Sequence, residues 1–447
     1  MTVLDHRRLT QATLRLDIDG LRRGLYSDKY FDNVTAVLTA AQQAGYTFAG
    51  SSPRDLPGDP AQVAIGDLVV EVQVFTRRKP YALIAGVDAA LAMIRHATGC
   101  YDADGHFTET WDQLEVEAVE DGVFAAYDGD PLQVRPVIKI RGRYRDFALL
   151  ETPILGVLTR ASRVATNVYQ VLEVANGKPV LFFPARFDLP EVQAIDGYAY
   201  WLAIQRINAD KNASMTAAVS TDAQASWWGG RGGGTIPHAL IAAFLADTAE
   251  SMVAFARFRP VSIPRIALVD FNNDAAGDSL KTLAAFWPLY RAAYESGDEE
   301  GQRRWTLNGV RIDTSASVRD VSLGEGDPYG INPKLVRLVR DRIDTAWQSW
   351  DVPEPLHEIA EKYCRNVQIV VTGGFNRERI AQYEAEGVPV DVYGVGSSLL
   401  RNDSATGTDF TMDVVRVQIN GQWVDMAKVG RQPNTNPDLQ PVDLSQL

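Results

Sequence analysis

Residues 367–398, VQIVVTGGFNRERIAQYEAEGVPVDVYGVGSS, contain two short apolar runs that each end in a glycine-rich cluster. A polar segment of helical character lies between the two runs. Apolar runs without polar alternation are typical of strands that are buried on both faces, as in a parallel sheet. Because parallel neighbours need a crossover connection, commonly a helix, this stretch predicts two parallel strands joined by a helix.

The same rhythm extends back to about residue 149. The further apolar runs are PVLFFPAR (179–186), MTAAVST (215–221), IALVD (266–270) and GVRID (309–313). Successive runs end roughly 25 to 60 residues apart, which leaves room for a crossover helix each time. Their polar residues collect at the carboxyl ends, where both a βα barrel and a doubly wound sheet bind their ligands. The pattern predicts an α/β fold, and it does not separate these two architectures.

The region before residue 149 shows a different pattern, a mixture of helical and strand-like segments. Tyr26, Tyr30, Val34, Leu38 and Ala41 recur at helical spacing, which predicts an amphipathic helix over 26–41. Ser27 or Asp28 can cap its start and Gly45 can close its end. The other elements predicted here are strands at 67–75 and 133–144, a helix near 86–97 and a turn at 102–105.

The C-terminal region returns to strand character from Phe410, in FTMDVVRVQINGQWVDMAKV. Its Asn420-Gly421 pair predicts a hairpin turn. We expect this hairpin to pair with the N-terminal region. The polar, proline-rich residues that follow are expected to be loop or extended chain.

Composition excludes several classes of protein. The chain has 447 residues, with 44 basic and 57 acidic side chains and a formal charge of −13. That balance argues against a nucleic-acid binder. Cys100 and Cys364 are the two cysteines, which excludes a disulfide scaffold and an all-cysteine zinc site. The first residues lack the apolar core of a signal peptide, and Asp247 and Glu250 interrupt the longest apolar stretch, so we expect a soluble cytoplasmic protein without a membrane partner.

The segment GGRGGGTIPHAL, which begins at Gly229, is the most informative for chemistry. Thr235 can cap a helix, Pro237 is tolerated in the first turn, and His238 then lies where helix amides point outward. A helix N-terminus attracts phosphate, and a neutral imidazole there can act as nucleophile or general base. The alternative is a histidine that merely packs at the start of a helix.

Several strand ends carry groups suited to a phosphorylated sugar. Phe183 and Arg186 follow one run, and an aromatic ring suits a flat ligand while a guanidinium suits phosphate. Asp270, Arg311 and Asp313 end two others, where carboxylates can bind ribose hydroxyls or magnesium-bound water. Taken singly, each could instead be a core aromatic or a structural ion pair.

Two glycine turns complete the set of candidate groups. The sequences TGG (372–374) and GVGSS (394–398) offer backbone amides at adjacent strand ends, and such nests bind phosphate monoesters. The alternative is a pair of tight turns that need glycine only for geometry. Several strand ends each carry a group suited to a phosphorylated sugar. This agreement favours a common binding site over separate structural roles for each residue.

In this order along the chain, these residues resemble nicotinate phosphoribosyltransferase, of the type II phosphoribosyltransferase family. SDKYF resembles its Asp-x-Tyr element, LLETPILGVLTRASRVAT (149–166) the helix that opens its barrel, and FPAR its Phe-Gly-x-Arg element. GTIPHAL resembles its Gly-Thr-x-x-His element, and ALVD, VRIDTS, VTGGF and VYGVGSS resemble its strand ends. The resemblance covers nearly the whole chain, and GTIPHAL is its most specific part.

The resemblance implies an irregular βα (TIM-like) barrel over 149–405, with a smaller α+β sheet domain formed by 1–148 and 406–447. It implies that nicotinate and phosphoribosyl pyrophosphate give nicotinate mononucleotide and pyrophosphate, with coupled ATP hydrolysis, in NAD biosynthesis. It also implies Mg²⁺ as cofactor and at least a homodimer. Two distant cysteines cannot build the metal site that some members have, so we expect no structural zinc.

The resemblance also implies roles for single residues. Phe183 stacks on the pyridine, and Tyr30, with Asp28, completes the site from a neighbouring subunit. Arg186 and Arg311 hold phosphoribosyl pyrophosphate, Asp270 and Asp313 bind its ribose or magnesium, and His238 is phosphorylated by ATP. The remaining expected substrate-binding residues, most of them for the 5′-phosphate, are Thr235, Gly373, Gly374, Gly394, Gly396 and Ser397.

Two positions depart from the family pattern. Pro184 stands where glycine is usual, and Phe187 follows Arg186 where many members have a second basic residue. The alternatives are therefore a transferase for nicotinamide or quinolinate, or a catalytically silent paralogue that binds nucleotide. A different phosphosugar enzyme is a weaker alternative, and the absence of lysine at the predicted strand ends disfavours a Schiff-base aldolase.

Overall fold

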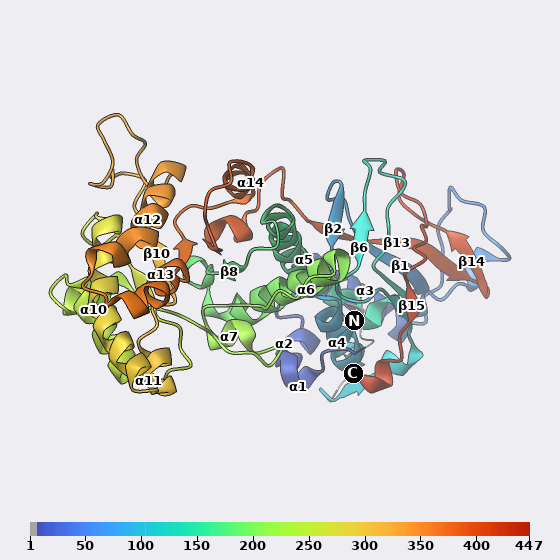
Figure 1. Ribbon diagram of the computed structural model, residues 1–447. Coiled ribbons are helices and arrows are strands. Elements are labelled where there is room, and N and C mark those ends of the chain that lie inside the picture. Colours follow the sequence, from blue (N-terminus) through green and yellow to red (C-terminus); the bar gives the residue numbers. More distant parts are fainter. Residues whose placement is uncertain (1–6, 103) are drawn as a thin grey trace.

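The computed structural model of the chain describes residues 7–102 and 104–447. It is a mixed α/β protein with two main sheets. An antiparallel sheet built from the N-terminal region and the C-terminal strands lies at one end of the molecule, and a parallel sheet with its helices lies toward the other (Figure 1). The predicted α/β class is therefore confirmed.

The antiparallel sheet has six strands in the order β14-β13-β1-β7-β5-β15. Their bounds are β1 Val69–Thr76, β5 Glu115–Ala118, β7 Ile138–Arg143, β13 Phe410–Ile419, β14 Gln422–Asp425 and β15 Gln440–Pro441. Strand β1 lies between β7 and β13, so the C-terminal strand pairs directly with the N-terminal region. Two small sheets accompany it, formed by β2 Tyr81–Leu83 with β6 Phe124–Ala126 and by β3 Gly99–Tyr101 with β4 Phe107–Glu109.

The hairpin between β13 and β14 turns at Asn420 and Gly421, as predicted. Both residues have positive φ, at 49° and 77°, which is the requirement of a two-residue turn of this kind. The segment after residue 430 is mostly irregular, and its short strand β15 pairs with β5.

The parallel sheet has five strands in the order β8-β12-β11-β10-β9. Their bounds are β8 Val180–Phe182, β9 Ile266–Leu268, β10 Gly309–Ile312, β11 Gln368–Val371 and β12 Val392–Val395. Five of the six predicted runs thus form strands. The run at 215–221 was wrongly predicted as a strand, because it contributes only one bridge, between Val219 and Phe182. Within the described residues the sheet is open, so a closed barrel is not confirmed.

Helices surround both sheets. Their bounds are α1 Gln11–Leu14, α2 Ile18–Arg22, α3 Lys29–Gln43, α4 Val87–Ala97, α5 Glu151–Val174, α6 Gln193–Lys211, α7 Asp222–Ala225, α8 His238–Ala243, α9 Thr248–Phe258, α10 Ala275–Glu295, α11 Glu299–Arg304, α12 Pro333–Thr345, α13 His357–Arg365 and α14 Arg377–Ala385. Across the described residues, none of these helices combines the length and the apolar character needed to cross a bilayer.

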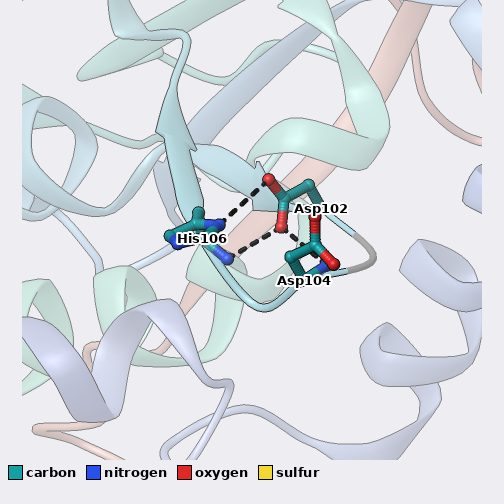
Figure 2. Close-up of side chains that lie close together, drawn as sticks. All are labelled: Asp102, Asp104 and His106. Carbon is teal, nitrogen blue, oxygen red and sulfur yellow. Dashed lines mark hydrogen bonds and ion pairs between the residues drawn. The ribbon is translucent and has the colours of Figure 1, made fainter.

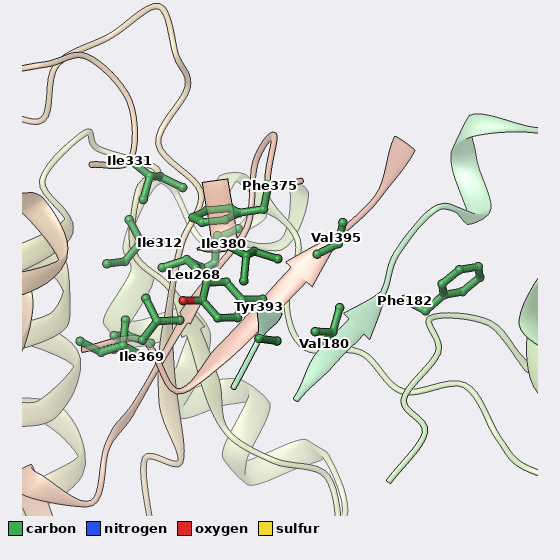
Figure 3. Close-up of a cluster of buried hydrophobic side chains, with 14 of the residues drawn as sticks. Val180, Phe182, Leu268, Ile312, Ile331, Ile369, Phe375, Ile380, Tyr393 and Val395 are labelled. Atoms are coloured by element: carbon green, nitrogen blue, oxygen red, sulfur yellow. The ribbon is translucent and has the colours of Figure 1, made fainter. Parts of the chain in front are cut away.

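Helix α5 connects the two hydrophobic cores. Ile154 and Leu158, in its first half, pack into the core of the antiparallel sheet. Val164 and Val168, in its second half, pack into the core of the parallel sheet. Figure 3 shows part of that second core, where strand residues such as Tyr393 pack together with side chains from the following loops and helices. The helix therefore fixes the position of one sheet relative to the other. No observation tests the predicted domain boundaries at 148 and 405.

The predicted N-terminal helix is α3, which begins after Asp28 and ends before Ala44 and Gly45. Its apolar stripe is only partly covered: Val34 and Leu38 are half-buried. Phe31 is its buried residue, whereas Tyr30 and Val37 are 59% and 65% exposed. The amphipathic pattern thus predicted the helix correctly, but most of its apolar face lies on the surface of the single chain.

Candidate functional site

The carboxyl ends of the parallel strands surround one cavity of about 800 Å³. Four strand ends contribute to its lining: β8, β10, β11 and β12. The predicted site residues that line it are Phe183, Arg186, Thr235, Arg311, Asp313, Gly373, Gly374, Gly394, Gly396 and Ser397. Residues separated by more than 200 positions along the chain thus meet at one place, as expected of a parallel sheet.

Phe183 forms part of the cavity wall beside strand β12. Its backbone amide donates to the carbonyl of Val395 at 2.8 Å, which extends the pairing of β8 with β12. Its ring lies so close to Gly394 that a Cβ atom there would approach the ring carbons to 3.1 Å. The Thr372 methyl would be closer still, so Gly394 is needed for the close approach of both side chains rather than for a positive φ.

Arg186 and Phe187 lie in a short 3₁₀ turn, Ala185–Phe187, that follows Pro184. The guanidinium of Arg186 lies over the Phe187 ring at 5.3 Å, within cation–π range. Pro184 has φ −84°, so the position that departs from the family pattern is accommodated without a left-handed backbone. Both aromatic rings and the Arg186 side chain face the same cavity.

Arg311, on β10, is the most buried of the predicted cationic residues. Its Nη2 donates to the carbonyl of Ile236 at 3.2 Å, and its Nε has no hydrogen-bond partner among the described residues. Burial lowers the pKa of Arg311, and the neighbouring carboxylates of Asp313 and Asp270 oppose that shift. A half-buried cation with an unused donor is suited to an anionic ligand.

His238 and Asp270 form a close pair beside this cavity. His238 Nε2 lies 3.0 and 3.1 Å from the two carboxylate oxygens of Asp270. Burial raises the pKa of Asp270, while the contact with His238 lowers it. The imidazole is still about half exposed, so a ligand can reach the ring. The structure therefore brings together two residues that sequence reasoning had placed on separate elements.

The predicted capping role of Thr235 is wrong. Helix α8 begins at His238 with Pro237 as its N-cap, so Thr235 precedes the helix by too many residues to accept from its first amides. The Thr235 hydroxyl is buried at the cavity and lacks a partner within the described parts of the chain, as does the hydroxyl of Thr372. Orphaned polar atoms of this kind indicate a polar ligand.

The turn after β11 contains two glycines in the left-handed region. Gly373 has φ +86° and Gly374 has φ +72°. A Cβ atom on Gly373 would also lie 3.0 Å from the Asp313 carboxylate. Arg379 of α14 donates from Nη1 to the Gly373 carbonyl at 2.9 Å. Because this bond fixes the carbonyl direction, the peptide plane of the turn is held in one orientation.

Asp28 and Tyr30 are not brought to the cavity of the same chain. Tyr30 donates from its hydroxyl to Asp28 at 3.1 Å, and Asp28 also accepts from the Thr152 hydroxyl at 3.2 Å. Both lie at the N-terminal end of the exposed face of α3. Any contribution to a site has to come through contact with a second molecule.

Sequence reasoning missed several residues of the cavity wall. They are Ala185, Ser220, Gly233, Gly234, Ile236, Pro237, Phe375, Asn376, Ser398 and Arg401. Arg401 is the one of these that carries a charge, and the signal for it was its position three residues after the GVGSS turn.

A cluster of potential metal ligands lies far from these strand ends in the sequence. Asp102, Asp104 and His106 place their side chains together at an exposed turn (Figure 2). Asp102 Oδ1 already accepts from the backbone amides of Asp104 and His106, at 2.9 and 2.8 Å. These bonds explain the cluster as a self-stabilised turn, which agrees with the turn predicted here.

Comparison with known proteins shows similarity to phosphoribosyltransferases. Residues 59–162 match the family model of the quinolinate phosphoribosyl transferase N-terminal domain. A nicotinate phosphoribosyltransferase of Mycobacterium tuberculosis is 23% identical over 301 residues, which cover 67% of this chain and 52% of that protein. The chain thus spans about half the length of the curated relatives it matches.

Solved structures extend the likeness to most of the chain. A nicotinate-nucleotide pyrophosphorylase from Pyrococcus furiosus is 24% identical, with a TM-score of 0.62 over 93% of this chain and 79% of that one. The human nicotinic acid phosphoribosyltransferase is 16% identical, with a TM-score of 0.51 over 89% of this chain and 76% of that one. The chain therefore has the fold of the type II phosphoribosyltransferases. In sequence it is similar to the quinolinate phosphoribosyl transferase model and to a nicotinate phosphoribosyltransferase.

Proposed function

We propose that this protein is a nicotinate phosphoribosyltransferase, which forms nicotinate mononucleotide and pyrophosphate from nicotinate and phosphoribosyl pyrophosphate. The observation that carries the proposal is a single cavity lined by aromatic rings, three arginines, a carboxylate and two glycine turns. Its buried polar atoms without partners in the described chain are suited to a polyanionic sugar.

Transfer of the ribosyl group to a ring nitrogen requires positioning more than a strong base, because the pyridine nitrogen already has a lone pair. Phe183 offers a face for the pyridine, and Arg186 and Arg311 offer charge to the departing pyrophosphate. The amides of the turns at 372–374 and 394–398 would hold the 5′-phosphate. Fixed donors of this kind stabilise charge as it develops in the transition state.

Asp270 and Asp313 are the residues that would hold Mg²⁺, directly or through water and substrate. Both follow neighbouring parallel strands and interact electrostatically, and carboxylate oxygens are ligands that Mg²⁺ prefers. The raised pKa of Asp270 reflects a buried carboxylate that a cation would help to keep charged. When bound, the ion would neutralise part of the charge on the pyrophosphate.

The pair of His238 and Asp270 supports coupling to ATP. Since a carboxylate accepts, Asp270 favours the imidazole tautomer whose proton is on Nε2. The lone pair on Nδ1 is then free to attack a terminal phosphoryl group, with ADP as the leaving group. A phosphorylated His238 next to the substrate cavity would add negative charge that substrate-bound magnesium can offset.

The order of the parallel strands supports a barrel around this site. Strands β9, β10, β11 and β12 are neighbours in the sheet in the same order as in the chain. The next neighbour in the sheet after β12 is β8, the first of these strands in the chain. Val219 then continues the series next to Phe182. In a βα barrel the strands lie side by side in chain order, and the last strand is next to the first. The observed order is expected of such a barrel with one irregular side.

The exposed face of α3 supports a homodimer or a larger homo-oligomer. Tyr30 and Val37 are apolar or aromatic and exposed, and they lie on a regular helix. An isologous contact through this face would cover them and could bring Tyr30 to the cavity of a second subunit.

One assay tests the function. Purified protein is incubated with Mg²⁺, phosphoribosyl pyrophosphate and nicotinate, nicotinamide or quinolinate, each with and without ATP. We expect nicotinate mononucleotide as the main product, and more of it with ATP. Quinolinate is included because the matched family model is that of quinolinate transferases. If another pyridine gives the main product, that pyridine is the acceptor instead of nicotinate. If none of the three gives a product, the proposal that the protein is a phosphoribosyltransferase is contradicted.

A further inference from the structure

The cavity wall contains a third arginine, Arg401, whose backbone is held by side-chain hydrogen bonds. Arg401 follows the short 3₁₀ turn Ser397–Leu400, directly after the glycine turn that ends β12. Its side chain lines the cavity and is 54% exposed. Its guanidinium Nε lies 2.6 Å from Asp403 Oδ2, in a pair that is open to solvent.

The backbone around Arg401 is held by Asn167 of helix α5. Asn167 is 6% exposed and donates from Nδ2 to the carbonyls of Leu399 and Arg401, at 3.1 and 3.0 Å. The same amide group accepts from the buried Arg78, at 2.8 Å. Arg78 also donates to the carbonyl of Thr406 and the hydroxyl of Thr408, at 3.1 and 2.9 Å.

These contacts define a clamp of Arg78 and Asn167 on the loop 399–408. Arg78 comes from the end of β1 in the antiparallel sheet, and Asn167 comes from α5, which spans both cores. Directly before this loop, Ser398 Oγ donates to the Phe375 carbonyl at 2.8 Å, which joins the chain there to the turn after β11. Three other segments of the chain thus contact this stretch around Arg401.

The three arginines of the cavity come from different elements: Arg186 from the turn after β8, Arg311 from β10 and Arg401 from the chain after β12. Arg311 interacts electrostatically with Asp313, Asp270 and Arg186, so these four groups form one set. Arg401 instead follows the turn that contains Gly394, Gly396 and Ser397. The amides of that turn are neutral donors, whereas a phosphate monoester is a dianion that gains from a full positive charge and a guanidinium fork.

We propose that Arg401 recognises the 5′-phosphate of the phosphoribosyl substrate, from a loop that the clamp of Arg78 and Asn167 holds in place. The proposal rests on the proposed function for the identity of the sugar phosphate. In the occupied site the guanidinium would exchange its solvent-exposed contact with Asp403 for a contact with phosphate oxygens. The carboxylate of the pyridine is the other anion that such a guanidinium could bind.

The test compares wild type with Arg401→Ala and Arg401→Lys. Arg365→Ala is the matched control, because Arg365 is also an exposed arginine that pairs with a nearby carboxylate, and it does not line the cavity. The measurements are KM for phosphoribosyl pyrophosphate and for nicotinate, and inhibition constants for ribose 5-phosphate and for pyrophosphate.

For Arg401→Ala we expect the inhibition constant of ribose 5-phosphate and KM for phosphoribosyl pyrophosphate to rise about tenfold or more. The inhibition constant of pyrophosphate and KM for nicotinate should stay the same. Arg401→Lys should lie between wild type and Arg401→Ala, since it keeps the charge without the fork, and Arg365→Ala should match wild type. A rise in KM for nicotinate alone would assign Arg401 to the carboxylate, and unchanged constants would remove it from binding; either result overturns the proposal.

Direct calorimetry of ribose 5-phosphate binding separates this inference from the proposed function. If wild type makes no mononucleotide but binds ribose 5-phosphate more tightly than Arg401→Ala does, the phosphate assignment stands and the assignment of the reaction fails. If wild type is active and binds ribose 5-phosphate no better than Arg401→Ala does, the phosphate assignment fails alone.

Discussion

At the scale of single residues, the pairing of His238 with Asp270 has the clearest functional consequence. Asp270 orients the imidazole and leaves the ring about half exposed, whereas a histidine that only packs at the start of a helix would have no reason to face a buried carboxylate. The geometry favours the chemical interpretation of His238 over the packing alternative.

For His238→Ala we predict that ATP no longer stimulates product formation, while some transfer without ATP remains. The reason is that the variant lacks the nucleophile for phosphoryl transfer but keeps the residues that position both substrates. Mononucleotide formation measured with and without ATP checks this prediction. His106→Ala is the control, because His106 is exposed at the distant turn of Asp102. Full stimulation by ATP in His238→Ala would rule out the proposed phosphorylation.

Single residues also show where sequence reasoning reached its limit. The glycines at 373 and 374 were predictable, because a turn at a strand end that needs positive φ demands them. The role of Thr235 was not, since the position of a helix start depends on the whole loop rather than on the nearest residue that can cap. Arg401 was missed because its position three residues after the GVGSS turn is a weak signal until the fold places its side chain against the cavity.

At the scale of elements, the turn after β11 is the part of the site that depends most on backbone conformation. For Gly373→Ala we predict a rise in KM for phosphoribosyl pyrophosphate of about tenfold or more, from a strained turn and the contact of the new Cβ with Asp313. Steady-state kinetics measures this effect. Gly421→Ala is the control, because it also places alanine at positive φ, in the distant hairpin, and should leave KM unchanged. Unchanged KM in Gly373→Ala would show that the turn does not hold substrate.

The start of helix α5 contains a half-buried acid, Glu151, that makes stability depend on pH. Burial, and then the nearby Asp413 and Asp28, raise the pKa of Glu151 to about 8. The folded state therefore keeps a proton that the unfolded chain loses above its ordinary pKa, and stability falls as pH rises from about 4.5 to 8. We predict that Glu151→Gln melts roughly 1–3 °C above wild type at pH 8 and close to it at pH 4.5.

Thermal melts of wild type and Glu151→Gln across this range of pH measure the effect. Glu358→Gln, an exposed acid in the first turn of α13, is the control and should show no such difference. A difference of the same size at both ends of the range would mean that Glu151 acts through packing rather than through its proton.

Elements also differ in how well the sequence predicts them. Strands β9 to β12 were found because each is a continuous apolar run followed by polar residues. The run at 215–221 has the same composition but ends as irregular chain with one bridge, since pairing is decided by neighbours in space. The apolar stripe of α3 has helical spacing, but spacing does not say which surface covers it.

At the scale of the whole molecule, the cavity and the helix with Tyr30 lie on different parts of one chain. If two chains complete each other's sites, two inactive variants should restore activity when combined. We predict that Tyr30→Ala and Arg186→Ala have little activity alone. Unfolded together and refolded as a one-to-one mixture, they should recover about a quarter of wild-type activity, because half of random dimers hold one intact site out of two.

Activity of the refolded mixture measures this outcome, and each variant refolded alone is the control. A mixture no more active than the variants alone would mean that Tyr30 does not act across a subunit boundary. Full activity of Tyr30→Ala would remove that residue from the site altogether.

The position of β13 has a consequence for how the chain is made. This strand lies beside β1 although more than 330 residues separate their partners, such as Val74 and Met412. During synthesis, β1 can pair with β7 early, but its other edge has no partner until nearly the whole chain has left the ribosome. Throughout that time an apolar strand edge is open to other chains. A truncation before residue 410 makes the exposure permanent, so even products that retain every cavity residue are expected to aggregate.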